Sequence, residues 1–143
     1  LGSGFAGAVA ARAHCGASTR LIGVVSAHAT AYRDSFRAGK PVESPATTRL
    51  ADGMACRTPV PEALEVLLRE ADDVITVTDD EVGEAMRILF SDTHNVAEGA
   101  GAAALAGALQ QQERWRGKTV GVSVSGGNVD SDMFAGVLAR SAS

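Results

Sequence analysis

The sequence predicts an α/β protein built on an open, mostly parallel sheet. Three short apolar runs, at residues 20–26, 73–77 and 118–124, are separated by stretches of helical character, as expected for buried parallel strands. The chain is 45% hydrophobic but only 4% aromatic, so alanine, valine, leucine and glycine must fill the interior. Small side chains suit close packing of helices on a sheet better than a β-sandwich. A chain of 143 residues is long enough for one domain with a core.

Local signals mark the elements of the first half of the chain. Residues 5–15 are rich in alanine and predict a helix, which ends at Gly16 in the position that glycine favours after a helix. The apolar run at 20–26 predicts a strand, and residues 29–38 predict a helix stopped by a glycine and a proline. Three prolines and a glycine make regular structure unlikely over most of residues 40–60.

The second half continues the alternation. A helix over 61–71 begins with proline, which suits a first helical turn, and a strand follows at 73–77. Thr78 and Glu81 have the spacing of a capping box, so the acidic residues at 79–81 are explained as a helix start. The remaining expected elements are a helix over 79–91, a helix over 99–113, a strand over 118–124 and a helix from about 131 to 140.

Charge and cysteine content exclude several classes of protein. The net charge of −4 gives no electrostatic reason to expect nucleic acid or an anionic membrane as a partner. Cys15 and Cys56 form neither a disulfide framework nor a metal-binding spacing, which indicates free thiols in a reducing compartment. His14, His28 and His94 are scattered and suit surface or capping roles. We therefore expect a cytoplasmic protein with no membrane span and no metal site.

A glycine motif opens the chain. Residues 2–7 have the G-x-G-x-x-G spacing of a dinucleotide-binding turn, which requires a preceding strand and a carboxylate at the end of the next strand. Residues 25–28, which end the next expected strand, hold no carboxylate. A nicotinamide-binding domain is therefore disfavoured.

A second glycine-rich turn follows the last expected strand. Residues 125–128 read Ser-Gly-Gly-Asn, so both glycine turns are expected at the carboxyl edge of one sheet. Two such turns describe a pocket for a flat, phosphorylated cofactor, with one turn binding the phosphate through N–H groups and the other meeting the ring. The alternative is that residues 125–128 are only a tight connection between a strand and a helix.

Five motifs in order carry a resemblance that covers essentially the whole chain: LGSGFAG, RLIGVVS, ADGMA, VAEGAGAAALAG and GKTVGVSVSGGNVD. The series resembles the C-terminal part of threonine/serine dehydratases, which are fold-type II pyridoxal-phosphate (PLP) enzymes. It looks most like catabolic threonine-dehydratase-like and hydroxyectoine-utilisation proteins. The resemblance implies a three-layer, tryptophan-synthase-β-like fold with helices on both faces of the sheet. It also implies that residues 1–143 are an incomplete piece, the C-terminal part of the large PLP-binding domain.

The resemblance assigns a cofactor role to several residues. The N-terminal turn would hold the phosphate, and the family serine in the second turn would hydrogen-bond the pyridine nitrogen, which a hydroxyl is too weak an acid to keep protonated. Glu98 would lie near the ring, although an acid favoured by the dipole of the following helix explains it equally well. The implied cofactor-binding residues are Gly2, Ser3, Gly4, Gly53, Glu98, Ser125 and Gly126.

The catalytic lysine is not among the residues that match. The resemblance implies a Schiff-base lysine in a serine-x-lysine stretch upstream of Leu1, whereas Lys40 and Lys118 are expected to be solvated surface residues. No catalytic residue is therefore assigned within this chain, which is expected to be inactive alone. The carboxylates with which relatives bind a divalent cation are missing after residues 20–26, so no metal is expected there.

The implied activity is that of an ammonia-lyase in amino-acid catabolism. The enzyme would eliminate water from threonine or serine and release a 2-oxo acid and ammonia, with β-hydroxyaspartate also open as substrate. The lack of a regulatory domain after residue 143 favours a catabolic type. Apolar surface left uncovered predicts a homodimer. The competing hypothesis is a non-enzymatic α/β module that binds a phosphorylated ligand or nucleotide.

Overall fold

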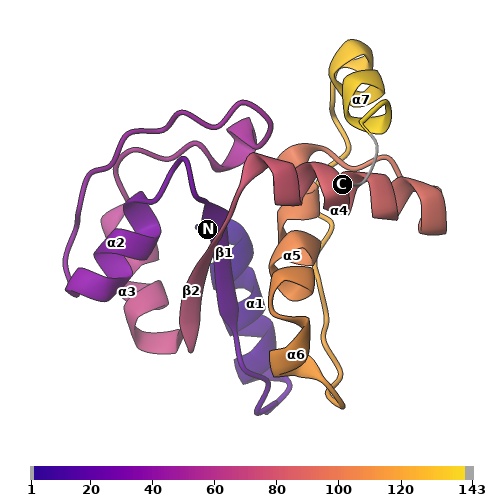
Figure 1. Cartoon of the computed structure of the whole chain (residues 1–143). Coiled ribbons are helices and arrows are strands. Elements are labelled where there is room, and N and C mark those ends of the chain that lie inside the picture. Colours follow the sequence, from indigo (N-terminus) through magenta and orange to yellow (C-terminus); the bar gives the residue numbers. More distant parts are fainter. Residues whose placement is uncertain (1, 141–143) are drawn as a thin grey trace. The chain divides into compact units, whose positions relative to one another are not determined.

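The computed structural model describes residues 2–140 (Figure 1). These residues divide into two compact units. The first is formed by residues 2–47 and 54–76, and the second by residues 48–53 and 77–140. Each unit is described by itself below.

The first unit contains a parallel pair of strands with helices packed around it (Figure 1). The two strands are neighbours in the sheet although two helices lie between them in the sequence, which is the connection that parallel strands require. The apolar strands and the α/β class are therefore confirmed. The elements are α1 (Ser3–His14), β1 (Ile22–Ser26), α2 (Ala31–Ala38), α3 (Pro61–Glu70) and β2 (Asp73–Val77), whose last residue belongs to the second unit.

The core of this unit is made of aliphatic side chains and one tyrosine. Phe5 of α1 packs against it from its edge. The Tyr32 hydroxyl, which enters the core with its ring, accepts a hydrogen bond from the Val60 backbone N–H at 3.2 Å. A tyrosine can be buried at low cost only when its hydroxyl has such a partner. The buried members of the core are Val25, Tyr32, Leu64, Leu67 and Val74.

Two glycines end helices of the first unit as expected. Gly16 has a φ of +60°. The N–H groups of Gly16 and Ala17 return to the carbonyls of Ala13 and Arg12, which satisfies the last turn of α1. Gly39, with a φ of +66°, ends α2 in the same left-handed region. Only glycine adopts this conformation without strain, so these helix ends follow from the sequence.

The second unit is built on two helices in close contact, α4 (Asp79–Thr93) and α5 (Gly99–Gln110). The contacting faces are small: α5 buries Ala102, Ala103 and Ala106, and α4 buries Ala85 with Met86. Small side chains let two helix backbones approach closely. The unit also contains the 3₁₀ turn Asp52–Met54, whose last residue belongs to the first unit, α6 (Gln112–Trp115) and α7 (Ser131–Leu138).

The capping box at the start of α4 is confirmed. The Thr78 N–H donates to the Glu81 carboxylate at 2.7 Å, and the Glu81 N–H donates to the Thr78 hydroxyl at 3.2 Å. The helix expected over residues 99–113 is interrupted at Gln111, where φ is −113° and α5 gives way to α6.

The third strand, expected over residues 118–124, is wrong. The segment is extended and runs back along α5 (Figure 1), but no described residue pairs with it as a neighbouring strand. Val120, Val122 and Val124 are 45%, 38% and 45% exposed. An apolar run becomes a strand only where a second strand satisfies its backbone groups. The glycine-rich turn at 125–128 therefore follows an unpaired segment and not the edge of a sheet.

Across residues 2–140, every helix is too short or too polar to span a lipid bilayer.

Candidate cofactor site

The N-terminal glycine turn forms the start of α1 in the first unit. Gly2 occupies the cap position with φ +117° and ψ −127°, a conformation open to glycine alone. A Cβ on Gly4 would meet nothing within 4 Å, and the first turn of α1 holds no acidic residue. The N–H groups of a first helical turn have no partner within the helix, and the helix dipole favours an anion there. Gly2, Ser3 and Gly4 thus suit a phosphate.

Three segments far apart in the sequence come together in the second unit. The Glu98 N–H donates to the Gly126 carbonyl at 3.0 Å, which joins the start of α5 to the turn at 125–128. Leu50 lies against α5 on another side, because a Cβ on Gly99 would be 2.0 Å from the Leu50 carbonyl oxygen. We call these three segments, residues 48–53, 96–101 and 125–127, the glycine cradle.

The glycines of the cradle are required by the closeness of the backbones. A Cβ on Gly101 would lie 2.4 Å from the Gly126 carbonyl oxygen, and a Cβ on Gly127 would lie 2.6 Å from the Val96 carbonyl oxygen. Neither separation is possible for real atoms. Sequence reasoning missed Gly99, Gly101 and Gly127, because nothing local shows that their neighbours are other parts of the backbone.

The side chain of Glu98 lies inside the cradle. Glu98 is half-buried at the cap position of α5, yet its carboxylate makes no capping hydrogen bond. Its Oε1 would be 2.4 Å from a Cβ on Gly126 and 3.8 Å from a Cβ on Gly53, which itself faces Ala100 at 3.0 Å. Gly53, Glu98 and Gly126, expected separately from the sequence, thus meet in one place.

Ser125 presents a free hydroxyl beside the cradle. The residue is exposed, and within the described part of the chain its hydroxyl makes no hydrogen bond. It adjoins Gly126, whose backbone is fixed by the bond to Glu98. A hydroxyl on a fixed backbone can donate to or accept from a ligand without losing a protein partner.

Asp79 has a role that sequence reasoning missed. The acidic residues after Thr78 were explained only by the helix start, but the Asp79 carboxylate accepts from the Thr48 hydroxyl at 2.7 Å and from the Arg49 N–H at 2.9 Å. The Thr48 hydroxyl in turn accepts from the Ala51 N–H at 3.1 Å. Asp79 therefore ties the 48–53 segment to α4, a link across about thirty residues that no local pattern reveals.

Both lysines and all three histidines lie apart from such contacts. Lys40 follows the end of α2 and Lys118 follows α6, and both are exposed. His94 takes the left-handed position that ends α4, with φ +58°. Among residues 2–140, no three histidine, cysteine, aspartate or glutamate side chains are grouped closely enough to hold a metal ion.

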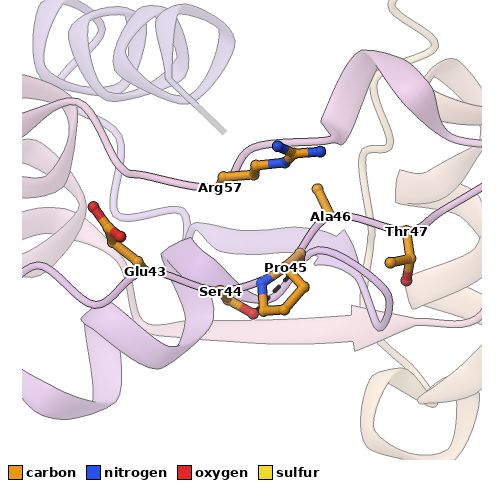
Figure 2. Close-up of a pocket in the computed structure, with 6 residues that line it drawn as sticks. All are labelled: Glu43, Ser44, Pro45, Ala46, Thr47 and Arg57. Atoms are coloured by element: carbon orange, nitrogen blue, oxygen red, sulfur yellow. Dashed lines mark hydrogen bonds between the residues drawn. The ribbon is translucent and has the colours of Figure 1, made fainter.

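A separate pocket of about 420 Å³ lies in the irregular part of the first unit (Figure 2). Arg57 reaches over it from one stretch of chain, opposite the stretch that carries the other lining residues (Figure 2). Its two charged residues are exposed, so their charges are screened by water. It contains none of the expected cofactor residues. The lining residues are Glu43, Ser44, Pro45, Ala46, Thr47 and Arg57.

Comparisons with solved structures agree with this fold. A threonine deaminase from the organism abbreviated T.th. superposes with a TM-score of 0.78 at 32% identity, over 86% of this chain and 44% of that one. Maize serine racemase superposes with a TM-score of 0.79 at 30% identity, over 90% of this chain and 40% of that one.

Sequence comparisons give the same family. An L-threonine ammonia-lyase from Geobacter sulfurreducens is 37% identical over 122 residues, which are 85% of this chain and 30% of that protein. The chain thus spans less than half the length of the relatives it matches. The family model described as "Pyridoxal-phosphate dependent enzyme" matches residues 1–126. The chain belongs to the family of pyridoxal-phosphate dependent enzymes.

Proposed function

We propose that these residues form the C-terminal part of the large cofactor-binding domain of a PLP-dependent ammonia-lyase. The reaction converts threonine or serine into a 2-oxo acid and ammonia: the substrate loses its α-proton and its β-hydroxyl as water, and a water molecule then releases ammonia from the product. The observation that carries the proposal is the meeting of Gly53, Glu98 and Gly126 in the glycine cradle. The similarity to an L-threonine ammonia-lyase supports the reaction type.

The residues present fit the cofactor. The cradle offers bare backbone where a Cβ on Gly126 would collide with Glu98 and a Cβ on Gly53 would crowd Ala100. Ser125 adds an unused hydroxyl, and the start of α1 adds unpaired N–H groups. A flat ring and a phosphate are the two chemical features that these groups suit. When bound, PLP supplies an electron sink for negative charge on the substrate's α-carbon.

The roles of this chain's own residues follow from their chemistry. The N–H groups of Gly2, Ser3 and Gly4 would bind the phosphate dianion at the positive end of the α1 dipole. The Ser125 hydroxyl would hydrogen-bond the pyridine nitrogen without holding it as a cation, because a hydroxyl is too weak an acid to do so. Glu98 would occupy the space beside Gly126 and so keep water out of it.

The lysine that bonds the cofactor would come from residues outside the 143 given. Lys40 and Lys118 are exposed, so neither has the desolvated environment that activates a lysine as nucleophile or base. The exposed valines of residues 118–124 support an assembly that covers them, for which a homodimer is our proposal.

The test is made on the complete protein that contains this chain. We expect borohydride reduction with PLP to fix one cofactor on one lysine, located by mass spectrometry outside residues 1–143. We also expect 2-oxo acid and ammonia to appear from threonine or serine. PLP binding without a lysine adduct would instead favour the non-enzymatic module, and no binding would overturn the proposal. Reduction without PLP is the control.

A further inference from the structure

The 48–53 segment carries Gly53 and is held at two points within the second unit. At its start, the Asp79 carboxylate accepts hydrogen bonds from the Thr48 hydroxyl and from the Arg49 N–H. At its end, Gly53 lies against Ala100, at the start of α5. Ala51 between them is fully buried. The backbone that borders the cradle is therefore set by α4 on one side and α5 on the other.

The neighbouring aspartate shows what the first turn of α4 needs without this link. Asp80 carries the same charge in the same helical turn, but its side chain is 90% exposed and is bonded to Arg140 at 3.3 Å on the surface. Asp79 is half-buried and accepts from two donors of one segment. Hydrogen bonds to a charged, partly buried acceptor are much stronger than an exposed ion pair. The two residues therefore form a matched pair for experiment.

We propose that Asp79 is a positioning residue for the cofactor. Its carboxylate fixes Thr48 and Arg49, and the Thr48 hydroxyl passes the constraint to the Ala51 N–H at 3.1 Å. This holds the backbone up to Gly53 against α5 and keeps the cradle in its binding-competent form before any ligand arrives. The inference rests on the proposed function, in which Gly53 borders the cofactor.

The first experiment measures the segment without the cofactor. The Arg49–Leu50 bond is a trypsin site that is protected only while the segment is ordered. In the complete apoprotein we expect Asp79→Ala to raise the rate of this cleavage roughly tenfold, since two hydrogen bonds to a carboxylate are lost. Cleavage after Arg57 should stay unchanged, and Asp80→Ala should leave both rates at the wild-type level. Equal cleavage after Arg49 in both variants would overturn the inference.

The second experiment measures the cofactor. Asp79→Ala should weaken PLP binding, followed by cofactor absorbance, on the order of tenfold, and Asp79→Asn should restore part of the loss because its amide oxygen still accepts. Thr48→Val removes the same link from the other side, so it replaces Asp79→Ala if that variant does not fold. Faster cleavage with unchanged PLP affinity would overturn the positioning role. Failure of the proposed function is distinguishable, because the wild-type protein itself would then bind no PLP.

Discussion

Replacing Gly101 with alanine should destabilise the protein, although the same change usually stabilises a helix. Gly101 lies in α5, where a Cβ would be 2.4 Å from the Gly126 carbonyl oxygen and 3.1 Å from the Gly126 nitrogen. To reach the closest tolerable separation, the two backbones must part by roughly 0.6 Å or more. That movement stretches the hydrogen bond from the Glu98 N–H to the Gly126 carbonyl, now 3.0 Å, to the limit of hydrogen-bond geometry.

The magnitude follows from three opposing effects on the free energy of unfolding. The gain in helix propensity is about 1 kcal/mol. Loss of a backbone hydrogen bond at a partly buried site costs about 1–3 kcal/mol. Strain from an added methyl group in a closely packed place costs about 1–3 kcal/mol more. We therefore expect Gly101→Ala to lower the free energy of unfolding by about 3 kcal/mol in total.

Urea denaturation followed by circular dichroism measures this change. Gly136→Ala is the matched control, because Gly136 lies inside α7 and a Cβ there would meet nothing within 4 Å. That variant should gain about 0.5–1 kcal/mol from helix propensity alone. If Gly101→Ala gained stability as Gly136→Ala does, the backbone contact between α5 and the turn at 125–128 would be refuted.

Three further predictions concern the cofactor, the core and acid stability. Ser125→Ala should weaken PLP binding to the complete protein by about two- to tenfold, as expected for one lost hydrogen bond; unchanged affinity in a fluorescence titration would remove Ser125 from the site. Leu67→Ala, at a side chain only 1% exposed, should cost about 2–5 kcal/mol in thermal or urea unfolding, and a cost below about 1 kcal/mol would contradict the core described. The Leu21 N–H and the Arg20 guanidinium hold the pKa of Asp72 below its usual value of 3.8. A lowered folded-state pKa stabilises the protein above that value, so the stability difference between wild type and Asp72→Asn should be constant from about pH 5 to 7 and shrink below about pH 4. A difference independent of pH down to about pH 2 would show that the Asp72 pKa is not lowered by folding.

The parts of the fold that could be predicted were those with local causes. Gly16 ended α1 and the pair Thr78 and Glu81 began α4, because a helix end is decided by residues within one turn of it. The strand at 73–77 was predicted from its apolar run and confirmed as β2. Residues 118–124 have the same composition, but a strand also needs a neighbour, which composition does not encode.

The candidate site divides in the same way. The glycine turns and Ser125 were recognised from a resemblance between motifs, and the meeting of Gly53, Glu98 and Gly126 fits that interpretation. Gly99 and Asp79 were not recognised, since each faces a part of the chain about thirty to fifty residues away. Such pairs depend on tertiary packing, which a single sequence does not display.

The glycine cradle also has a consequence for how the protein matures. Its contacts join residues that are distant in sequence: Thr48 bonds Asp79, Gly53 faces Ala100, and Glu98 bonds Gly126. Contacts of this kind close long loops and form late in folding, after helices and other local structure. During synthesis, Gly126 emerges long after Gly53, so the binding surface does not exist until most of the chain is made. A ligand that needs the cradle can therefore bind only chains that have finished folding, which makes cofactor capture a kinetic check on completed protein.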